Sequence, residues 1–204
     1  GSFDPSYLEV PSEVLTTSMI EHQRYFPVFD QAGKLLPGFI GVNNGTASNI
    51  DVVRAGNERV LKARLEDALF FWKEDLKKDW DQVVEKLDSV LFHERLGTVR
   101  DKVTRLQKNA AAIAKQIGGV EMTIIDRAAF LCKADLLSSM VYEFPELQGI
   151  MGRYYAIETG EREEVCNAIY EHYLPRFAGD ELPSSRAGIV LSLAEKIDHL
   201  TSFF

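Results

Sequence analysis

Apolar residues recur at alternating intervals of three and four between residues 96 and 117: Leu96, Val99, Val103, Leu106, Ala110, Ile113 and Ile117. This spacing places them on one face of an α-helix that packs against a helical core. Gly118 and Gly119 follow and are expected to end the helix. Similar patterns predict helices at residues 123–144, which Pro145 ends, at 163–173, and from after residue 185 to the end of the chain.

The pattern before residue 90 is mixed. A short helix is predicted from Ser12, as its N-cap, to about residue 23. Residues 25–29 and 35–42 read as two strands joined by a loop that contains Gly33. Pro27 and Pro37 favour edge or bulged strands. Because one hairpin is not stable alone in water, we expect this piece to come from a larger sheet, or to complete a sheet together with sequence that is absent here.

A polar loop is predicted at residues 43–49, a helix from Asn57 through Trp72, and a short helix at 83–90. Residues 147–156 and 173–183 show neither helical nor strand periodicity and are predicted to be loops. The predicted fold class is therefore mainly α, and α+β overall. A soft boundary divides an α+β segment at residues 1–85 from a helical bundle at residues 86–204.

Composition narrows the class of protein. With 204 residues, 46% of them hydrophobic, the chain can bury a core. No apolar run approaches the ~20 residues that cross a bilayer, and the start of the sequence lacks the pattern of a signal peptide, so a cytoplasmic location is expected. Cys132 and Cys166 have no CxxC spacing and are expected to be reduced and packed. The phosphate-loop, dinucleotide, nucleophile-elbow and zinc-protease motifs are absent from the sequence.

Charge is unevenly distributed along the chain. The formal net charge of -8 argues against a nucleic-acid partner, because phosphate binding depends on Lys and Arg. Residues 91–115 nevertheless carry a local excess of four positive charges, from Arg95, Arg100, Lys102, Arg105, Lys108 and Lys115 against Glu94 and Asp101. This stretch is either a contact for RNA or simply a solvated helix face.

The two aperiodic segments carry a family resemblance. LQGIMGRYYA at residues 147–156 and YLPRFAGDELP at residues 173–183 resemble the central part of the glycyl-tRNA synthetase beta subunit family of bacterial two-subunit enzymes. QRYFPV at 23–28, GKLLP at 33–37, GNERVLKARL at 56–65 and RLGT at 95–98 extend the resemblance over almost the whole chain. We call residues 147–156 and 173–183 the first and second signature segments.

The resemblance also implies that the helical half is similar to the HD superfamily, named for a metal-binding His-Asp pair. Ala134 stands where that His would be, followed by Asp135, and Asp198 matches the late Asp of the superfamily. The first His of the pattern falls near residues 101–102 by approximate alignment. His22, His93, His172 and His199 do not lie at motif positions, so we expect a degenerate site without metal.

Asp135 and Asp198 lie on the apolar sides of their predicted helices, where an unpaired carboxylate is costly. We expect them to pair with Lys102, Lys133 or Arg residues. Arg153, Arg176 and Asp180 of the signature segments are candidates for loop-fixing contacts, with Arg176 meeting Asp180 or a helix end, or alternatively for phosphate contacts.

By resemblance, the chain is a catalytically inert fragment of a beta subunit in a heterotetrameric glycine-tRNA ligase whose alpha subunit forms the adenylate. Its partners would be the glycine tRNA, through the acceptor arm, and the alpha subunit, with beta self-association possible. It would need no cofactor itself, although the intact enzyme uses ATP and Mg²⁺. The expected tRNA contacts are Arg95, Arg100, Lys102, Arg105 and Lys108. The alternative is a metal-dependent HD-type phosphohydrolase, which Ala134 disfavours; a third reading is a purely structural interaction domain.

Overall fold

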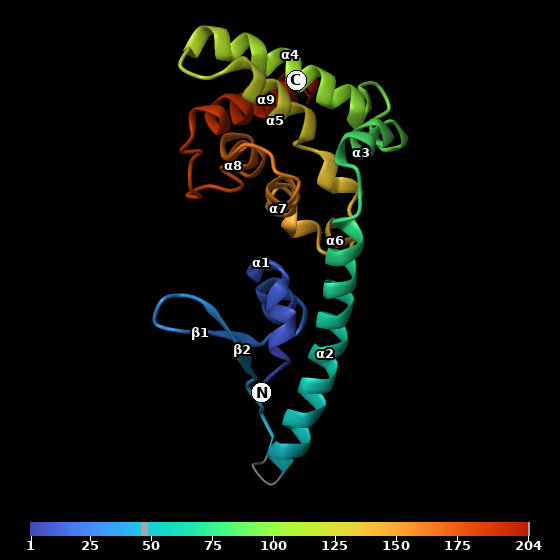
Figure 1. The fold of residues 1–204 in the computed structure, drawn as a ribbon, viewed down its shortest axis with the longest axis vertical. Helices are drawn as coiled ribbons and strands as arrows, with labels where there is room; N and C mark the ends of the chain where they lie inside the picture. The colour runs from blue at the N-terminus through green and yellow to red at the C-terminus, as the bar shows by residue number, and fades with distance from the viewer. Residues whose placement is uncertain (46–48, 204) are drawn as a thin grey trace. The chain divides into compact units, whose positions relative to one another are not determined.

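The computed structural model describes residues 1–45 and 49–203. Contacts divide the chain into two compact units, Gly1–Asp75 and Leu76–Phe204 (Figure 1). The predicted loop at residues 43–49 falls partly outside the described residues, as does Phe204 at the end of the last predicted helix. The fold is mainly α with two small hairpin sheets, which confirms the predicted class.

The first unit joins one long helix to a small hairpin. Its elements are η1 (Pro5–Glu9), α1 (Ser12–Thr17), the π-type turn η2 (Ser18–His22), β1 (Phe26–Phe29), β2 (Leu35–Ile40) and α2 (Ile50–Asp75). The strands are antiparallel, and their register shifts between Pro27 and Phe29, in keeping with the expectation of edge or bulged strands. The turn is held by Asp30, whose carboxylate accepts the backbone N–H groups of Ala32 and Lys34.

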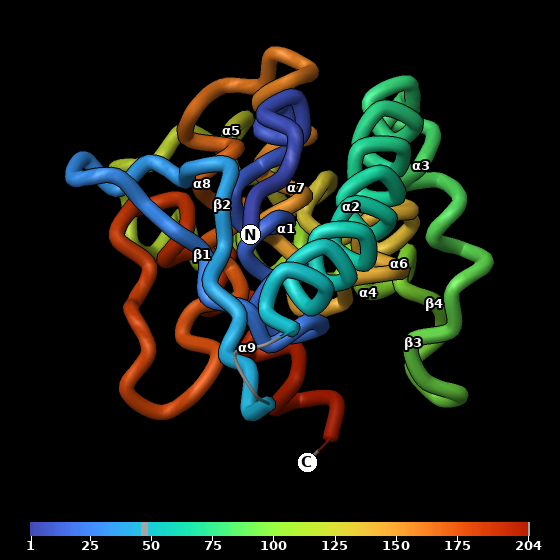
Figure 2. The backbone as a smooth tube through the Cα atoms, turned by 90° about the horizontal axis from the view of Figure 1, so that it is seen from below, coloured from blue at the N-terminus to red at the C-terminus, as the bar shows by residue number. Residues whose placement is uncertain are grey.

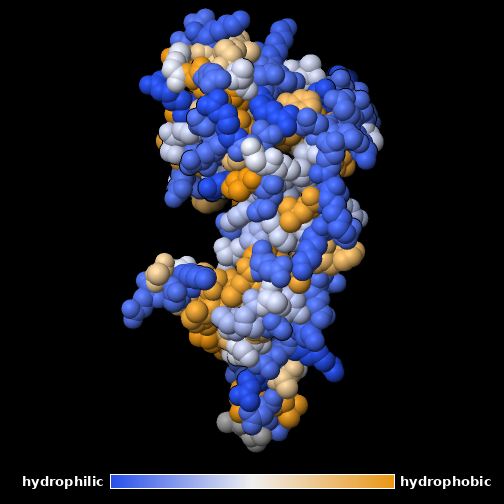
Figure 3. Space-filling view, viewed as in Figure 1, coloured by the Kyte–Doolittle hydropathy of each residue, from blue (hydrophilic) through white to orange (hydrophobic). Residues whose placement is uncertain are grey.

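Large apolar side chains remain exposed on the hairpin, namely Phe26, Phe29, Leu36 and Ile40. In the space-filling view, hydrophobic residues gather on the first unit beside the base of the hairpin (Figure 3).

Helix α2 begins at Ile50, seven residues before the position predicted for it. The sequence predicts an apolar stripe of Val60, Leu61, Leu65, Ala68, Leu69 and Trp72 on this helix. Leu61, Leu65, Ala68 and Trp72 are buried, whereas Val60 is 47% exposed. The additional turns bury no side chain, since Ile50 and Val52 are 49% and 74% exposed. Such turns carry no apolar periodicity in the sequence, because no face of them packs against a core.

The second unit is a helical bundle. Its elements are α3 (Trp80–Lys86), η4 (Leu87–Ser89), β3 (Leu91–His93), β4 (Gly97–Thr98), α4 (Val99–Ile117), α5 (Met122–Leu131), η5 (Ala134–Leu137), α6 (Ser139–Glu143), η6 (Pro145–Leu147), α7 (Ile150–Glu158), α8 (Glu163–Glu171) and α9 (Arg186–Phe203). Helix α4 packs on α5 and α9, and α8 packs on α7 and α9 (Figures 1 and 2). Residues 76–85, which the sequence groups with the first segment, pack with α5 and η5 through α3.

Helix α4 shows how local signals set the ends of an element. It starts at Val99, after Thr98, which forms a capping box with Asp101. It ends at Gly118, whose φ of 67° is a conformation that glycine adopts at little cost. Leu96, the first residue of the predicted stripe, precedes this helix at the β3–β4 hairpin.

Two predictions in this unit are wrong. The single helix predicted at residues 123–144 is broken into α5, η5 and α6, with Ser138 capping α6 through the N–H of Val141. The first signature segment is no loop, because most of it forms α7. Its glycines and its position after Pro145 are typical of a loop sequence, although Met151, Gly152, Tyr155 and Ala156 are buried in the helix.

Among the described helices, none is both long and apolar enough to span a membrane.

Candidate functional site

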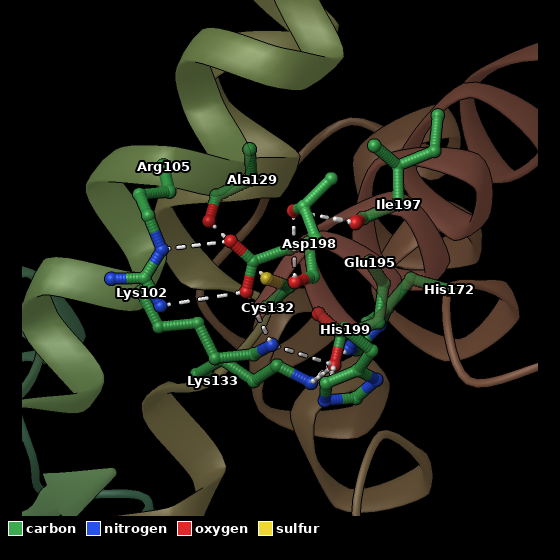
Figure 4. Close-up of polar contacts among 11 residues, drawn as sticks. Lys102, Arg105, Ala129, Cys132, Lys133, His172, Glu195, Ile197, Asp198 and His199 are labelled. Carbon is green, nitrogen blue, oxygen red and sulfur yellow. Dashed lines mark hydrogen bonds and ion pairs between the residues drawn. The ribbon is translucent and has the colours of Figure 1, made fainter. Parts of the chain in front are cut away.

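Charged and polar side chains meet inside the bundle where α4, α5, α8 and α9 come together. Lys102 comes from α4, Lys133 follows α5, His172 follows α8, and Glu195 and Asp198 come from α9 (Figure 4). We call these five residues the buried polar cluster. None is more than 5% exposed. Ionic groups at this depth need partners, because removing charge from water is costly.

Asp198 forms the best-paired part of the buried polar cluster. Its carboxylate accepts hydrogen bonds from Lys102 Nζ at 2.9 Å and from Arg105 Nε at 2.7 Å (Figure 4). Burial alone would raise the pKa of Asp198, but these two cations hold it below its usual value. The expected pairing of Asp198 with lysine and arginine is therefore present, and it connects α9 to α4.

A second group of contacts centres on Lys133. Its Nζ lies 3.1 Å from Glu195 Oε1 and 2.9 Å from His172 Nε2. His172 Nδ1 lies 2.5 Å from the carbonyl oxygen of Ile169, so Nδ1 carries the proton and Nε2 accepts from the lysine. Burial, and then the positive charge of Lys133, lower the pKa of His172 well below its usual value. His172 is therefore a neutral acceptor.

The charges in this group reinforce one another. Burial alone would raise the pKa of Glu195, but Lys133 and Lys102 bring it down to about 2. Burial alone would lower the pKa of Lys133, but its neighbours Tyr173 and Glu195 hold it above the usual value. Glu195 is thus ionised and shared between two ammonium groups, with Lys102 Nζ 3.4 Å away.

This arrangement suits a structural role better than catalysis. Lys133 and His172 are buried, and burial raises the pKa of the adjacent Cys132 thiol to about 12, so the thiol stays protonated. The carboxylates of Asp198 and Glu195 already face ammonium groups, whose charge would repel a divalent cation. Within the part of the chain that the structure describes, no group of three or more His, Cys, Asp and Glu side chains has a metal-binding arrangement.

Asp135 is held by the first signature segment rather than by a cation. Its Oδ2 accepts the N–H groups of Gly149 at 2.6 Å and Gly152 at 3.1 Å, at the start of α7. Burial raises the pKa of Asp135 to about 6, against the effect of these N–H groups. Ala134, which stands at the His position implied by the resemblance, is also buried. The two glycines therefore explain how this helix start accommodates a buried carboxylate.

Both glycines have a steric reason to be glycine. Gly149 has a φ of 80°. A Cβ on Gly152 would lie 2.9 Å from Cγ2 of Ile169 and 3.1 Å from Oδ2 of Asp135. Asp135 and the first signature segment, which the sequence presents as separate features, are thus one site.

Arg176 ties the two signature segments together. Its guanidinium donates to the carbonyl oxygens of Glu146 at 3.1 Å and Gln148 at 2.8 Å, and its backbone N–H donates to Asp180 Oδ2 at 2.7 Å. These contacts are of the loop-fixing kind. Arg153 is exposed and lies with its guanidinium 6.0 Å from the ring centre of Tyr170.

The five expected tRNA contacts differ in exposure. Arg95 and Lys108 are exposed. The Arg100 side chain is 22% exposed and pairs with Glu85, and Arg105 is 32% exposed and pairs with Asp198. Lys102 is 3% exposed, so the structure removes it from the expected phosphate contacts. Its place on the buried face is visible in the sequence, since it lies three residues from Val99 and four from Leu106.

Sequence reasoning did not identify Glu195 and His172 as members of a site. Glu195 has the helical spacing of the apolar stripe, being four residues after Leu191, so a charged residue at an apolar position was the available signal. His172 has no such signal, because its role depends on Lys133, which is 39 residues away in the sequence.

Comparison with known proteins gives the family. The sequence profile of the glycyl-tRNA synthetase beta subunit matches residues 1–204. The chain is 68% identical over 204 residues to the glycine-tRNA ligase beta subunit of Syntrophomonas wolfei subsp. wolfei. It is 54% identical over 205 residues to that of Clostridioides difficile, and 52% identical over 206 residues to that of Synechocystis sp.. Each match covers 100% of this chain but only 30%, 30% and 28% of these relatives, respectively.

Proposed function

Since the chain belongs to the glycyl-tRNA synthetase beta subunit family, we propose that it supports the ATP-dependent joining of glycine to its tRNA by a larger enzyme. The observation that carries this proposal is the family match over the full 204 residues. The 30% share of the relatives limits the role of this chain to one part of that enzyme.

The proposed division of labour leaves adenylate formation to an alpha subunit. The alpha subunit uses the ATP and Mg²⁺, and this part of the beta subunit binds neither ATP nor a metal. Its partners are the glycine tRNA and the alpha subunit within a heterotetramer in the cytoplasm, with the acceptor arm as the region of tRNA contacted. The paired, inaccessible state of Lys102, Lys133 and Glu195 supports a part without a reaction of its own.

The proposed tRNA surface is the exposed side of α4 and the hairpin before it. Arg95 and Lys108 present their charges to solvent, and Arg100 adds a partly exposed guanidinium. Arg105 contributes less positive charge to this surface, because its Nε donates to Asp198 and its guanidinium also donates to the carbonyl oxygen of Leu96. Such contacts neutralise phosphates without reading bases, so they position a tRNA rather than select its sequence.

The proposed scaffolding role rests on the interior. Lys102 and Arg105 join α4 to α9, and Lys133 joins the end of α5 to both α9 and the residue after α8. These bonds fix the helices that carry the proposed tRNA surface. A rigid surface binds with less loss of conformational entropy than a mobile one.

Binding of tRNA at several salt concentrations tests the proposed surface. We expect Arg95→Ala/Lys108→Ala in the full-length beta subunit with its alpha subunit to weaken binding of any tRNA. Each lost phosphate contact should reduce the slope of log K against log salt by about 0.7 to 0.9.

The matched control is Arg54→Ala/Lys62→Ala, which removes two exposed positive charges from α2. We expect this control to leave the slope unchanged. An unchanged slope in Arg95→Ala/Lys108→Ala, or an equal decrease in both double variants, would show that α4 and the hairpin before it are not the tRNA surface.

A further inference from the structure

A small cavity lies beside Asp135 in the second unit. Its volume of about 10 Å³ is enough for one water molecule. Its lining comes from α3, α5, η5, α7 and α8 and includes Trp80, Asp135, Tyr155 and Thr159. All the lining residues except Thr159 are buried, and Thr159 is exposed, so it gives the cavity a side near solvent.

Two lining residues each bring a buried polar atom that has no hydrogen-bond partner among the described protein atoms. These atoms are Nε1 of Trp80 and Oδ1 of Asp135. Asp135 is 1% exposed and Trp80 is 6% exposed. Buried polar groups in folded proteins are nearly always hydrogen-bonded, so two such atoms at one cavity require an explanation.

The chemistry of the two atoms selects the ligand. An indole N–H can only donate a hydrogen bond, and an ionised carboxylate can only accept one. A ligand that satisfies both must accept from Trp80 and donate to Asp135. A metal cation cannot accept from the N–H group, and a simple anion has no proton to donate. Water does both and matches the volume.

We propose that a single internal water molecule bridges Nε1 of Trp80 and Oδ1 of Asp135. It accepts the indole proton and donates one of its own protons to the carboxylate. This water completes the coordination of Asp135, whose Oδ2 already receives the N–H groups of Gly149 and Gly152. Asp135 then connects α3, through the water, with the start of α7.

The ring of Trp80 is already positioned for this role. It stacks on Tyr155 of α7, with 4.4 Å between the ring centres and 21° between the ring planes. The stacking holds the indole ring in place on the wall of the cavity.

A crystal structure of the unaltered chain, at a resolution that shows ordered water, tests the proposal directly. We expect a density peak between about 2.7 and 3.2 Å from both Trp80 Nε1 and Asp135 Oδ1, without anomalous signal. A direct bond between these two atoms, a peak that behaves as a metal ion, or a cavity without a peak would each overturn the proposal.

Nuclear magnetic resonance of the indole N–H groups gives an independent reading in solution. The chain has two tryptophans, Trp72 and Trp80, so Trp80→Phe assigns the signals while it keeps an aromatic ring against Tyr155. We expect the Trp80 indole proton to show magnetisation transfer from a bound water, and Asp135→Leu, which cannot hold that water, to abolish the transfer. Absence of transfer in the unaltered chain, or equal transfer in the folded Asp135→Leu variant, would contradict the bridge.

Discussion

Asp135 is stabilised by backbone N–H groups that only a close approach of chain segments can supply. Gly149 and Gly152 bring these N–H groups within 2.6 and 3.1 Å of the carboxylate, and neither position has room for an ordinary side chain. The sequence shows an acid on an apolar face and a glycine-containing segment, but not their contact, since the nearer glycine, Gly149, is 14 residues from Asp135.

Replacing Gly152 with alanine tests this close approach. The added Cβ would press on Ile169 and Asp135, so we expect Gly152→Ala to lower the free energy of unfolding by about 1 to 3 kcal/mol. Gly56→Ala is the matched control, because Gly56 lies within α2 and nothing surrounds its Cβ position within 4 Å. In the control, the free energy of unfolding should rise by about 0.5 to 1 kcal/mol, because alanine forms helices better than glycine. Urea denaturation measures the stability of both variants, and equal changes in Gly152→Ala and Gly56→Ala would contradict the close approach at Gly152.

His172 should make stability depend on pH. The unfolded chain protonates this residue around its usual pKa of 6.5, whereas the folded chain keeps it neutral. The unfolded state therefore binds more protons as the pH falls. The contribution of neutral His172 is complete above pH 6.5 and is lost as the pH falls below it.

We expect His172→Gln to have a flatter stability profile than the unaltered chain between about pH 5 and 8. Urea denaturation across this range measures it. The raised pKa of Asp135 acts in the opposite direction in both proteins, since its contribution is lost as the pH rises through about 6, and it cancels in the comparison. Parallel pH profiles for the two proteins would show that His172 is not buried in its neutral form.

Helix α4 carries two populations of basic residues, and the sequence distinguishes them only in part. Its apolar stripe and Gly118 predict the helix and its end correctly. The same stripe contains Lys102, which is buried because Asp198 lies opposite it on α9. Periodicity does not show a partner 96 residues away, so Lys102 was predicted to be a tRNA contact on the basis of its charge alone.

Lys102→Ala and Lys108→Ala should therefore have different consequences. Lys102→Ala leaves buried carboxylates without one of their cations, and we expect it to destabilise the fold by about 3 kcal/mol. Lys108→Ala removes an exposed charge and should change stability by no more than about 0.5 kcal/mol. Chemical denaturation measures the stability of both variants. A large loss of stability in Lys108→Ala, or no loss in Lys102→Ala, would contradict the buried position of Lys102 and the exposed position of Lys108.

The signature segments are better explained as paired structures than as loops. Most of the first is α7, and Arg176 of the second is bonded to Glu146 and Gln148 just before it. We expect Arg176→Ala to lower the free energy of unfolding by roughly 1 to 3 kcal/mol, because it removes two side-chain hydrogen bonds worth about 0.5 to 1.5 kcal/mol each. The melting temperature should fall while tRNA binding by the folded enzyme stays the same. An unchanged melting temperature with weaker tRNA binding would instead make Arg176 a phosphate contact.

Much of the fold of the whole chain could be predicted from the sequence, but not all of it. Regular stripes and glycine stops predicted most of the helices, the hairpin and the mainly α class. The sequence did not predict the break after α5, where Lys133 and Asp135 contact residues far along the chain, nor the early start of α2, whose first turns bury no side chain. The resemblance supplied the family, which no arrangement of charges in the chain would have identified.

Measuring the two half-reactions of the intact enzyme tests the proposed role most directly. In Arg95→Ala/Lys108→Ala, we expect glycine-dependent pyrophosphate exchange, which reports adenylate formation, to match that of the unaltered enzyme. We expect the KM for tRNA in the charging reaction to rise, and Arg54→Ala/Lys62→Ala to change neither. An unchanged KM for tRNA, or a loss of pyrophosphate exchange, would contradict a beta-subunit part that contacts tRNA and leaves adenylate chemistry to its partner.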